Sequence, residues 1–259
     1  MLSDYHIHTR HNRCASPEMT VASVLERAGE TGLDQVGLVV HFHPGDDPAL
    51  FDRVRAEIAA ARSGGPGGPS QVLLGAEIDL MDQNGATSWR EELSGRVDYV
   101  LLAMGHTQMA WVQADLSLDP ETFLIRQTEG LLKALDTVPV TALAHPYIYG
   151  ALHRQSPELA YALRPHRLPE ELVRSLAARL VDGGVVFEYH CRDLLIRPQN
   201  LGGAAFVSSY AAFLDALREL GVRFIAGSDA HYLDQVGRSA HAPAWAQNPL
   251  PVHPQELHG

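Results

Sequence analysis

The stretch Gln35-Val-Gly-Leu-Val-Val40 is an almost entirely apolar run, and His41 follows it directly. A continuous run of this kind is typical of a strand that is covered on both faces, as in a parallel sheet. Six further short runs have the same strand character. They lie at residues 3–8, 72–78, 99–104, 140–144, 185–188 and 224–226. Because helical segments alternate with these runs, the sequence predicts the α/β class with a parallel sheet.

Apolar residues at helical spacing mark the segments between several of these strands. Four helices are expected, around residues 21–28, 50–58, 172–180 and 210–217, and Gly32 ends the first of them. A closed barrel and an open doubly wound sheet both fit seven strands in this order. The length of 259 residues and the polar residues at the strand ends favour the barrel.

The chain is expected to form one domain over residues 1–259. Residues 63–70 are rich in Gly and Pro, a composition typical of a flexible segment. Because the alternation of strands and helices continues across them, we predict a surface loop rather than a domain linker. Four prolines after Arg238 predict an irregular tail from about residue 238.

Charge and composition exclude several functional classes. The chain has 20 Lys and Arg against 31 Asp and Glu, a net charge of −11, which disfavours nucleic acids and anionic membranes as partners. The apolar runs fall far short of the ~18 residues that span a bilayer. Two cysteines, Cys14 and Cys191, exclude a disulfide framework. The first residues show no signal-peptide pattern, so a soluble cytoplasmic protein is expected.

Histidine is frequent, with 14 residues, and several histidines follow strands directly. His6 and His8 share one face at the end of the first strand, and two imidazoles at that spacing can bind one metal ion. Asp229 and His231 repeat the spacing after the seventh strand. Further histidines just past strand ends are His41, His106 and His145. In a barrel these ends converge on one face, so the joint pattern predicts a metal site there.

Two carboxylates and a thiol belong to the same region. Glu77 ends the third strand, where a carboxylate can bridge two cations. Glu77 and Asp79 share a face, so a two-carboxylate glycosidase is an alternative, although the neighbouring histidines favour a metal site. Asp79 and Asp82 are expected to be solvated loop carboxylates. Cys14 lies six residues after His8 and, as a thiolate, would favour zinc or iron over magnesium.

An ordered set of motifs resembles the PHP (polymerase and histidinol phosphatase) superfamily of metal-dependent phosphoesterases. The set runs from residue 4 to residue 231 and covers nearly the whole chain. Its members are Asp4-Tyr-His-Ile-His-Thr9, Gly37-Leu-Val-Val-His41, Gly75-Ala-Glu77, Gly105-His106, Ala144-His145-Pro146 and Gly227-Ser-Asp-Ala-His231. The resemblance implies a distorted (β/α)7 TIM-like barrel, with up to three metal ions at the C-terminal ends of its strands.

The resemblance also implies how the ligands are shared among these ions. The first ion would be held by His6, His8, Glu77 and Asp229. Glu77 would bridge to a second ion, which His106 and His145 complete. A third ion would be held by His41 and His231, with Cys14 at a position that is usually His or Asp.

The chain departs from the family pattern at three positions. Val40 stands where the family often has an acidic residue, and Cys14 is an unusual ligand. His190 stands where the family often has Asn two residues after a sixth-strand Glu. His43 is close enough to His41 to compete with it as a ligand, but the register from Gly37 favours His41.

The sequence leaves the roles of some catalytic residues undecided. Glu77 is expected to act as the metal bridge. The leaving oxygen needs a proton or a third cation, and His231, His43 and His190 are candidates among which the sequence does not choose. Residues expected to bind the substrate phosphate are Arg154, Arg192, Arg197 and His190. A guanidinium suits this role because it can bind two phosphate oxygens at once.

The predicted function is hydrolysis of a small-molecule phosphate monoester by an enzyme with two to three divalent ions (zinc, manganese or iron). Histidinol phosphate is the first candidate substrate, because stand-alone family members of this length include that phosphatase. A nucleotide or other broad-range phosphoesterase and a metal-dependent amidohydrolase-like enzyme are alternatives that would use the same site. A non-catalytic metal-binding module is the remaining class, and the complete ligand set argues against it.

Overall fold

The computed structural model describes residues 1–63, 68–104, 106, 109–149, 152, 162–201 and 203–251. Its seven strands form one sheet in chain order, and all neighbouring strands are parallel. The strands are β1 (Ser3–His8), β2 (Gln35–Phe42), β3 (Gln71–Asp79), β4 (Tyr99–Ala103), β5 (Ala142–Ala144), β6 (Val186–His190) and β7 (Phe224–Gly227). The predicted α/β class with a parallel sheet is confirmed.

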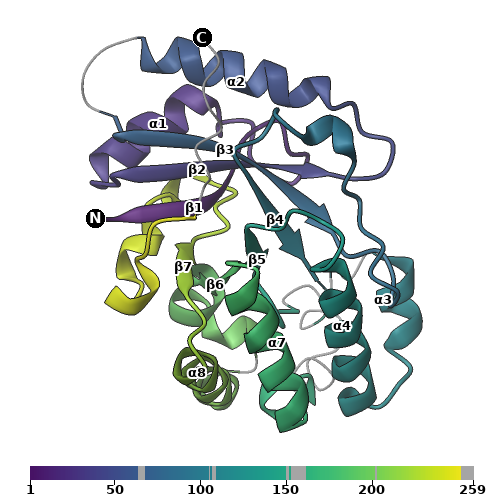
Figure 1. Cartoon of the computed structure of the whole chain (residues 1–259). Helices are drawn as coiled ribbons and strands as arrows, with labels where there is room; N and C mark the ends of the chain where they lie inside the picture. The colour runs from purple at the N-terminus through teal and green to yellow at the C-terminus, as the bar shows by residue number, and fades with distance from the viewer. Residues whose placement is uncertain are drawn as a thin grey trace.

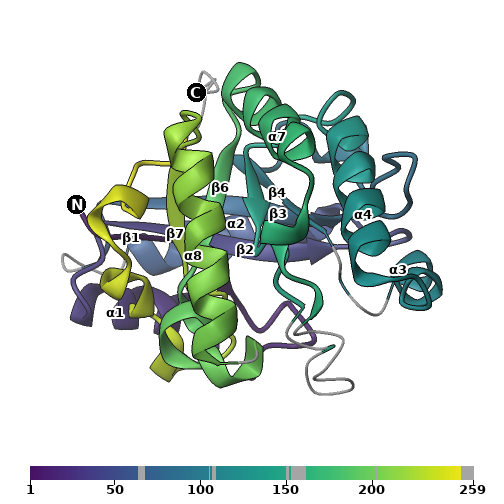
Figure 2. The same ribbon diagram turned by 90° about the horizontal axis from the view of Figure 1, so that it is seen from below.

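Helices surround this sheet on its outer side (Figure 1). They are α1 (Val21–Glu30), α2 (Ala49–Arg62), α3 (Ala110–Asp115), α4 (Pro120–Ala134), α7 (Glu170–Asp182) and α8 (Ala204–Glu219). Helices α1 and α2 contact each other, as do α4 with α7 and α7 with α8. Figure 2 shows α8 running along the sheet beside β6 and β7. Among the described residues, no helix is long and apolar enough to cross a membrane.

The sheet curls until β1 meets the chain directly after β7. Ile7 and Ala230 form an isolated parallel bridge. The His8 N–H donates to the Ala230 carbonyl at 2.9 Å, and the Ala230 N–H donates to the His6 carbonyl at 3.3 Å. This contact makes a nearly closed barrel, which confirms the predicted architecture. It also brings the first and last metal-ligand motifs of the sequence next to each other.

The inside of the barrel holds an apolar cluster that is separate from the core under the helices. The Tyr99 ring lies against Gly37 and Gly75, where an added Cβ would come within 2.2 Å of its hydroxyl and 2.3 Å of its ring. The Tyr99 hydroxyl donates to the carbonyl of Tyr5 at 2.8 Å. The cluster consists of Tyr5, Val39, Leu73, Tyr99, Leu101, Ala103, Ala142, Ala144, Val186, Ile225 and Leu250.

A bulge in β1 changes which side chains face inward. Asp4 pairs with Val36 and Ile7 pairs with Leu38, so β1 contains one residue more than β2 over this stretch. Bulges of this kind re-aim side chains and are frequent next to active sites. Here Tyr5 joins the interior cluster, while His6, one residue later, also faces the interior with the other potential ligands.

Helix α4 is a part of the fold that the sequence analysis does not anticipate. Its first turn carries the expected signals, because the Asp119 side chain accepts from the Thr122 N–H at 3.0 Å and Pro120 occupies the N-terminal position. Its buried residues include Phe123, Leu124 and Leu131. The helix therefore has both a cap and an apolar face, and both were readable in the sequence.

The segment after Arg238 is more ordered than expected. It forms two 3₁₀ turns, Arg238–His241 and Ala244–Ala246. The Gln247 side chain accepts from the Ser3 N–H at 3.3 Å, and Asn248 donates to the Phe224 carbonyl at 2.9 Å. These bonds hold the segment against β1 and β7. Residues 252–259, and residues 64–67 of the predicted Gly/Pro loop, lie outside the described residues.

Candidate metal centre

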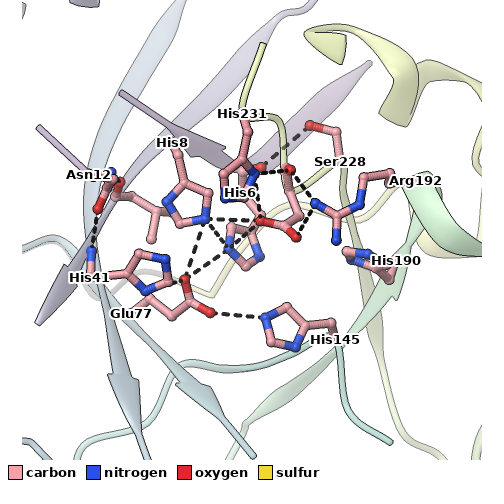
Figure 3. Close-up of polar contacts among 12 residues, drawn as sticks. His6, His8, Asn12, His41, Glu77, His145, His190, Arg192, Ser228 and His231 are labelled. Carbon is pink, nitrogen blue, oxygen red and sulfur yellow. Dashed lines mark hydrogen bonds and ion pairs between the residues drawn. The ribbon is translucent and has the colours of Figure 1, made fainter. Parts of the chain in front are cut away.

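The structure gathers the strand-end histidines and carboxylates at the C-terminal end of the barrel (Figure 3). Three overlapping groups of side chains could each hold an ion, because their ligand atoms lie within 4.8 Å of one another. The groups are His6, His8 and Glu77; Glu77, His106 and His145; and His8, His41 and His231. This grouping is close to the partition that the resemblance implies.

Glu77 occupies the centre of the site. Its Oε2 lies 3.3 Å from His6 Nε2 and 3.2 Å from His41 Nδ1, and its Oε1 lies 3.0 Å from His145 Nε2 and 3.5 Å from His106 Nε2. Oε2 also lies 3.5 Å from His8 Nε2. The two carboxylate oxygens therefore face two different sets of imidazoles, three at Oε2 and two at Oε1. That arrangement is the one a bridging carboxylate requires.

The contacts among these ligands fit a bound cation better than a hydrogen-bond network. His6 Nε2 and His8 Nε2 face each other at 3.2 Å. His41 Nδ1 is buried and lies near Glu77 without making a hydrogen bond. Nitrogen and oxygen donors of this kind suit zinc, manganese and iron. The residues present thus fit divalent metal ions.

Asp229 completes the site from the chain after β7. Its Oδ1 lies 3.0 Å from His8 Nε2 and 3.6 Å from His6 Nε2. Its other oxygen is 2.6 Å from Arg192 Nη1, which also donates to the Asp229 carbonyl at 3.1 Å. Asp229 and His145 have positive φ angles of 50° and 32°. Such strain in residues other than glycine concentrates at functional sites.

The charge states of the ligands follow from their surroundings. Burial raises the pKa of Glu77, but the adjacent His41 and His6 outweigh burial and hold that pKa well below its usual value. Burial lowers the pKa of His8 to about 3, and neighbouring His41 acts in the same direction. His8 is therefore neutral near pH 7, which is the form that binds metal.

Glu188 is a functional residue to which the sequence analysis gave no role. It is fully buried on β6, and its Oε1 accepts from His6 Nδ1 at 2.8 Å. Its Oε2 accepts a short hydrogen bond from the backbone N–H of His145. Glu188 thus fixes one ligand ring and one ligand backbone, a second-sphere role that most ligating histidines need.

Gly227 makes room for Glu188. An added Cβ at Gly227 would lie 1.8 Å from Glu188 Oε1 and 3.0 Å from His6 Cβ. The glycine therefore allows Glu188 to reach His6 across the barrel. The motif Gly227-Ser-Asp-Ala-His231 marks Gly227 in the sequence. Glu188, for which Gly227 makes room, lies 39 residues earlier in the chain.

The expectation that Asp79 is a solvated loop carboxylate is wrong. Asp79 is 2% exposed, and its two oxygens contact His106 Nδ1 at 2.5 Å and His43 Nδ1 at 2.7 Å. Burial raises its pKa, but the hydrogen bonds from His106 and His43 lower it to about 2. Asp82, by contrast, caps the turn after β3 by accepting from the N–H groups of Asn84 and Ala86. The sequence could not separate the two, because burial of Asp79 depends on residues from β2 and β4.

Cys14 stands apart from the compact ligand set. It is an exposed free cysteine and belongs to none of the three groups of ligand atoms found among the described residues. Asn12, two residues before Cys14, accepts a hydrogen bond from the His41 N–H at 2.7 Å and donates one to the Val39 carbonyl at 2.8 Å. Ligation by Cys14 stays a prediction.

Of the four predicted substrate-binding residues, the structure describes three. Arg192 lies in the site and contacts Asp229 and Asp193, within the π-helical segment Arg192–Ile196. Arg197 is exposed at the end of that segment, and Arg154 lies outside the described residues. His190 is fully buried, with Nε2 3.0 Å from Asp193 and its ring centroid 5.6 Å from that of His145.

The chain is similar to several known proteins. The family model described as PHP-associated matches residues 204–242. A protein from Acetivibrio thermocellus called a probable phosphatase is 26% identical over 168 residues, which is 65% of this chain and 56% of that relative. The match thus spans little more than half of the relative's length.

Two solved structures share the fold over most of their length. One is a histidinol phosphate phosphatase from Lactococcus lactis solved with zinc, L-histidinol and phosphate, with a TM-score of 0.56, 16% identity and coverage of 92% of this chain and 91% of that one. The other is a putative histidinol phosphatase from Listeria monocytogenes, with a TM-score of 0.61, 14% identity and coverage of 93% and 100%. The chain is thus similar to a PHP-associated family over residues 204–242 and to a probable phosphatase, and it shares its fold with the two solved structures.

Proposed function

We propose that this chain is a metal-dependent phosphoesterase that hydrolyses a small-molecule phosphate monoester. The observation that carries the proposal is Glu77, whose two oxygens face two different sets of histidines at the open end of the barrel. Such a carboxylate can hold two cations close together, which is the arrangement of two-metal hydrolases that act on phosphates.

Histidinol phosphate is the first candidate substrate. The support comes from the Lactococcus lactis structure, which contains histidinol and phosphate, and from the relative called a probable phosphatase. A net charge of −11 favours a small substrate, because the remote phosphates of a polynucleotide would meet an acidic surface. A cytoplasmic location remains our prediction from the sequence.

We assign two to three divalent ions to the site, with zinc, manganese or iron as the metal. His6, His8, Glu77 and Asp229 would hold one ion, and Glu77, His106 and His145 would hold another. A third would lie between His41 and His231, with Cys14 as a further predicted ligand. Bound ions of this type supply Lewis acidity toward phosphate oxygens and a water molecule activated near neutral pH.

The protein's own groups prepare the site for an anionic substrate. Arg192 is 24% exposed and is held by Asp229 on one side and Asp193 on the other. We infer that its guanidinium binds a phosphate oxygen at the rim of the site, since its fork geometry suits phosphate. His231 donates from Nδ1 to the Asp229 carbonyl at 2.8 Å, so its Nε2 faces the site. His43 and His231 are the groups proposed to protonate the leaving oxygen.

The test is phosphate release by the manganese-supplemented protein from histidinol phosphate, nucleotide monophosphates and an aryl phosphate. We expect a clear preference for one monoester, and loss of the activity in Glu77→Ala by more than the ~100-fold that removal of an outer partner causes. Glu57→Ala is the matched control, because Glu57 pairs with Arg10 and His11 on the outside of the barrel. Full activity in Glu77→Ala, or no phosphate release from any substrate by the metal-loaded wild type, would overturn the proposal.

A further inference from the structure

Asp79 contacts two histidines that have different surroundings. His106 has an 18% exposed side chain and points its Nε2 toward Glu77 at 3.5 Å. His43 has a 43% exposed side chain, at the open rim of the barrel. Each ring directs Nδ1 at one oxygen of the Asp79 carboxylate, at 2.5 Å and 2.7 Å. One carboxylate thus accepts from both rings at once.

The backbone of Asp79 is fixed independently of these rings. Its N–H donates to the Ser88 hydroxyl at 2.9 Å, and its carbonyl accepts from the Ser88 N–H at 3.0 Å. The Ser88 hydroxyl in turn donates to the Phe42 carbonyl at 2.6 Å. The carboxylate is therefore held between the end of β2 and the end of β3, two residues beyond Glu77 on the same inward face.

A carboxylate on Nδ1 decides which nitrogen of an imidazole carries the proton. With Nδ1–H donated to Asp79, the Nε2 of each ring is left with its lone pair when the ring is neutral. For His106 that nitrogen faces Glu77 in the metal centre. For His43 it is the nitrogen that remains available at the rim.

We propose that Asp79 is a positioning residue shared by the two, which orients His106 as a metal ligand and His43 as a substrate-contacting group. The inference rests on the proposed function for His43, but the assignment for His106 needs only metal binding. Asp79, a buried carboxylate outside the ligand set, would then act both in metal binding and in substrate contact. Second-sphere carboxylates of this kind typically alter metal affinity or activity by ~10–100-fold.

Metal binding tests the first half of the proposal without any substrate. Asp79→Asn keeps the size of the side chain but presents an NH₂ group, which cannot accept, to one of the two rings. We expect it to weaken binding of one Mn²⁺ by ~10–100-fold in a titration of the metal-free protein. Asp82→Asn is the matched control on the adjacent turn, and it should leave the titration unchanged. Wild-type Mn²⁺ affinity in folded Asp79→Asn would overturn the assignment.

Substrate kinetics test the second half. His43→Gln should leave the Mn²⁺ titration unchanged and lower kcat/KM for the preferred phosphate monoester, and Asp79→Asn should lower it further. Unchanged kcat/KM in His43→Gln would exclude a substrate contact. If the wild type released no phosphate at all, the proposed function would fail, while the titration would still decide whether Asp79 supports the metal centre.

The imidazole protons of the wild-type protein give a measurement that does not depend on how a variant folds. In the zinc-loaded protein, nitrogen-15 spectra of the histidine rings should show His106 and His43 protonated on Nδ1. A proton on Nε2 of His106 would place the metal or the carboxylate on the other nitrogen and would overturn the proposal. The same spectrum recorded on Asp79→Asn should show that the tautomer of at least one of the two rings has changed.

Discussion

The two ends of the barrel interior are built from the same strands but from different chemistry. On β1, β2, β3, β6 and β7 the inward residue is apolar near the start of the strand and polar, or a glycine beside polar groups, near its carboxyl end. The apolar members are Tyr5, Val39, Leu73, Val186 and Ile225, and the matching members at the other end are His6, His41, Glu77, Glu188 and Gly227. A shift of one to four residues along one strand thus separates a packed floor from the candidate metal site.

Along each of these strands, the residues that pack the floor are different from the residues at the ligand positions. The floor is close-packed and its polar groups are few, so a change there alters the volume that the core must fill. The upper end concentrates buried carboxylates and imidazoles, whose mutual contacts leave groups such as His41 Nδ1 without a hydrogen bond. A substitution at this upper end changes which nitrogen and oxygen atoms are placed to bind an ion. Substitutions at the two ends should therefore move different observables.

The largest effect is expected at the floor, from Tyr99→Ala. The Tyr99 ring is 2% exposed and lies against Gly37 and Gly75, so its removal leaves a cavity that glycines cannot fill. Truncation of a buried aromatic costs about 3–5 kcal/mol of unfolding free energy, which lowers Tm by roughly 6–20 °C for a chain of this size. Mn²⁺ affinity below the transition should stay at the wild-type value. Calorimetry and a metal titration on the same sample would show whether the two properties separate.

A smaller loss of stability, but a larger loss of metal, is expected at the upper end from Gly227→Ala. The new Cβ would occupy the position of Glu188 Oε1 and crowd His6 Cβ. Overpacking of this kind costs about 1–3 kcal/mol. The displaced Glu188 would release the His6 ring, so Mn²⁺ affinity should fall by ~10–100-fold.

The control for this variant is Gly68→Ala, where no atom lies within 4 Å of an added Cβ. Gly68→Ala should match the wild type both in Tm and in the Mn²⁺ titration. If Gly227→Ala lost stability yet bound Mn²⁺ as tightly as the control, the hydrogen bond from His6 to Glu188 would have no part in holding the metal.

How much of the fold and of the site could be predicted from the sequence depends on whether a feature is local in the chain. Strands and ligand positions were predictable because both are local patterns: an apolar run, and a histidine or aspartate at its end. Seven strands, the barrel and the grouping of His6, His8, Glu77 and His145 follow from such patterns and from the family motifs. Helix α4 also had local signals in Asp119, Pro120 and its apolar face, and these were overlooked.

What the sequence could not give are contacts between distant segments. Glu188 meets His6 across 182 positions, and Asp79 meets His43 and His106 from strands on either side. The β1 bulge that turns both Tyr5 and His6 inward depends on the pairing with β2. Each of these arises from closure of the barrel, so no pattern within a single segment reports it.

The smallest effect is expected from Tyr99→Phe, which separates packing from hydrogen bonding at the floor. The ring stays in place against the two glycines, and only the hydroxyl that donates to the Tyr5 carbonyl at 2.8 Å is lost. One buried hydrogen bond contributes about 0.5–1.5 kcal/mol, or roughly 1–6 °C in Tm, as measured by calorimetry. Tyr5 and His6 are the two residues inside the β1 bulge, so Mn²⁺ affinity reports whether the bulge needs that bond. Unchanged affinity with a lower Tm would show that the strand pairing alone holds His6 in place, whereas a parallel loss of affinity would show that the floor and the metal site are coupled through β1.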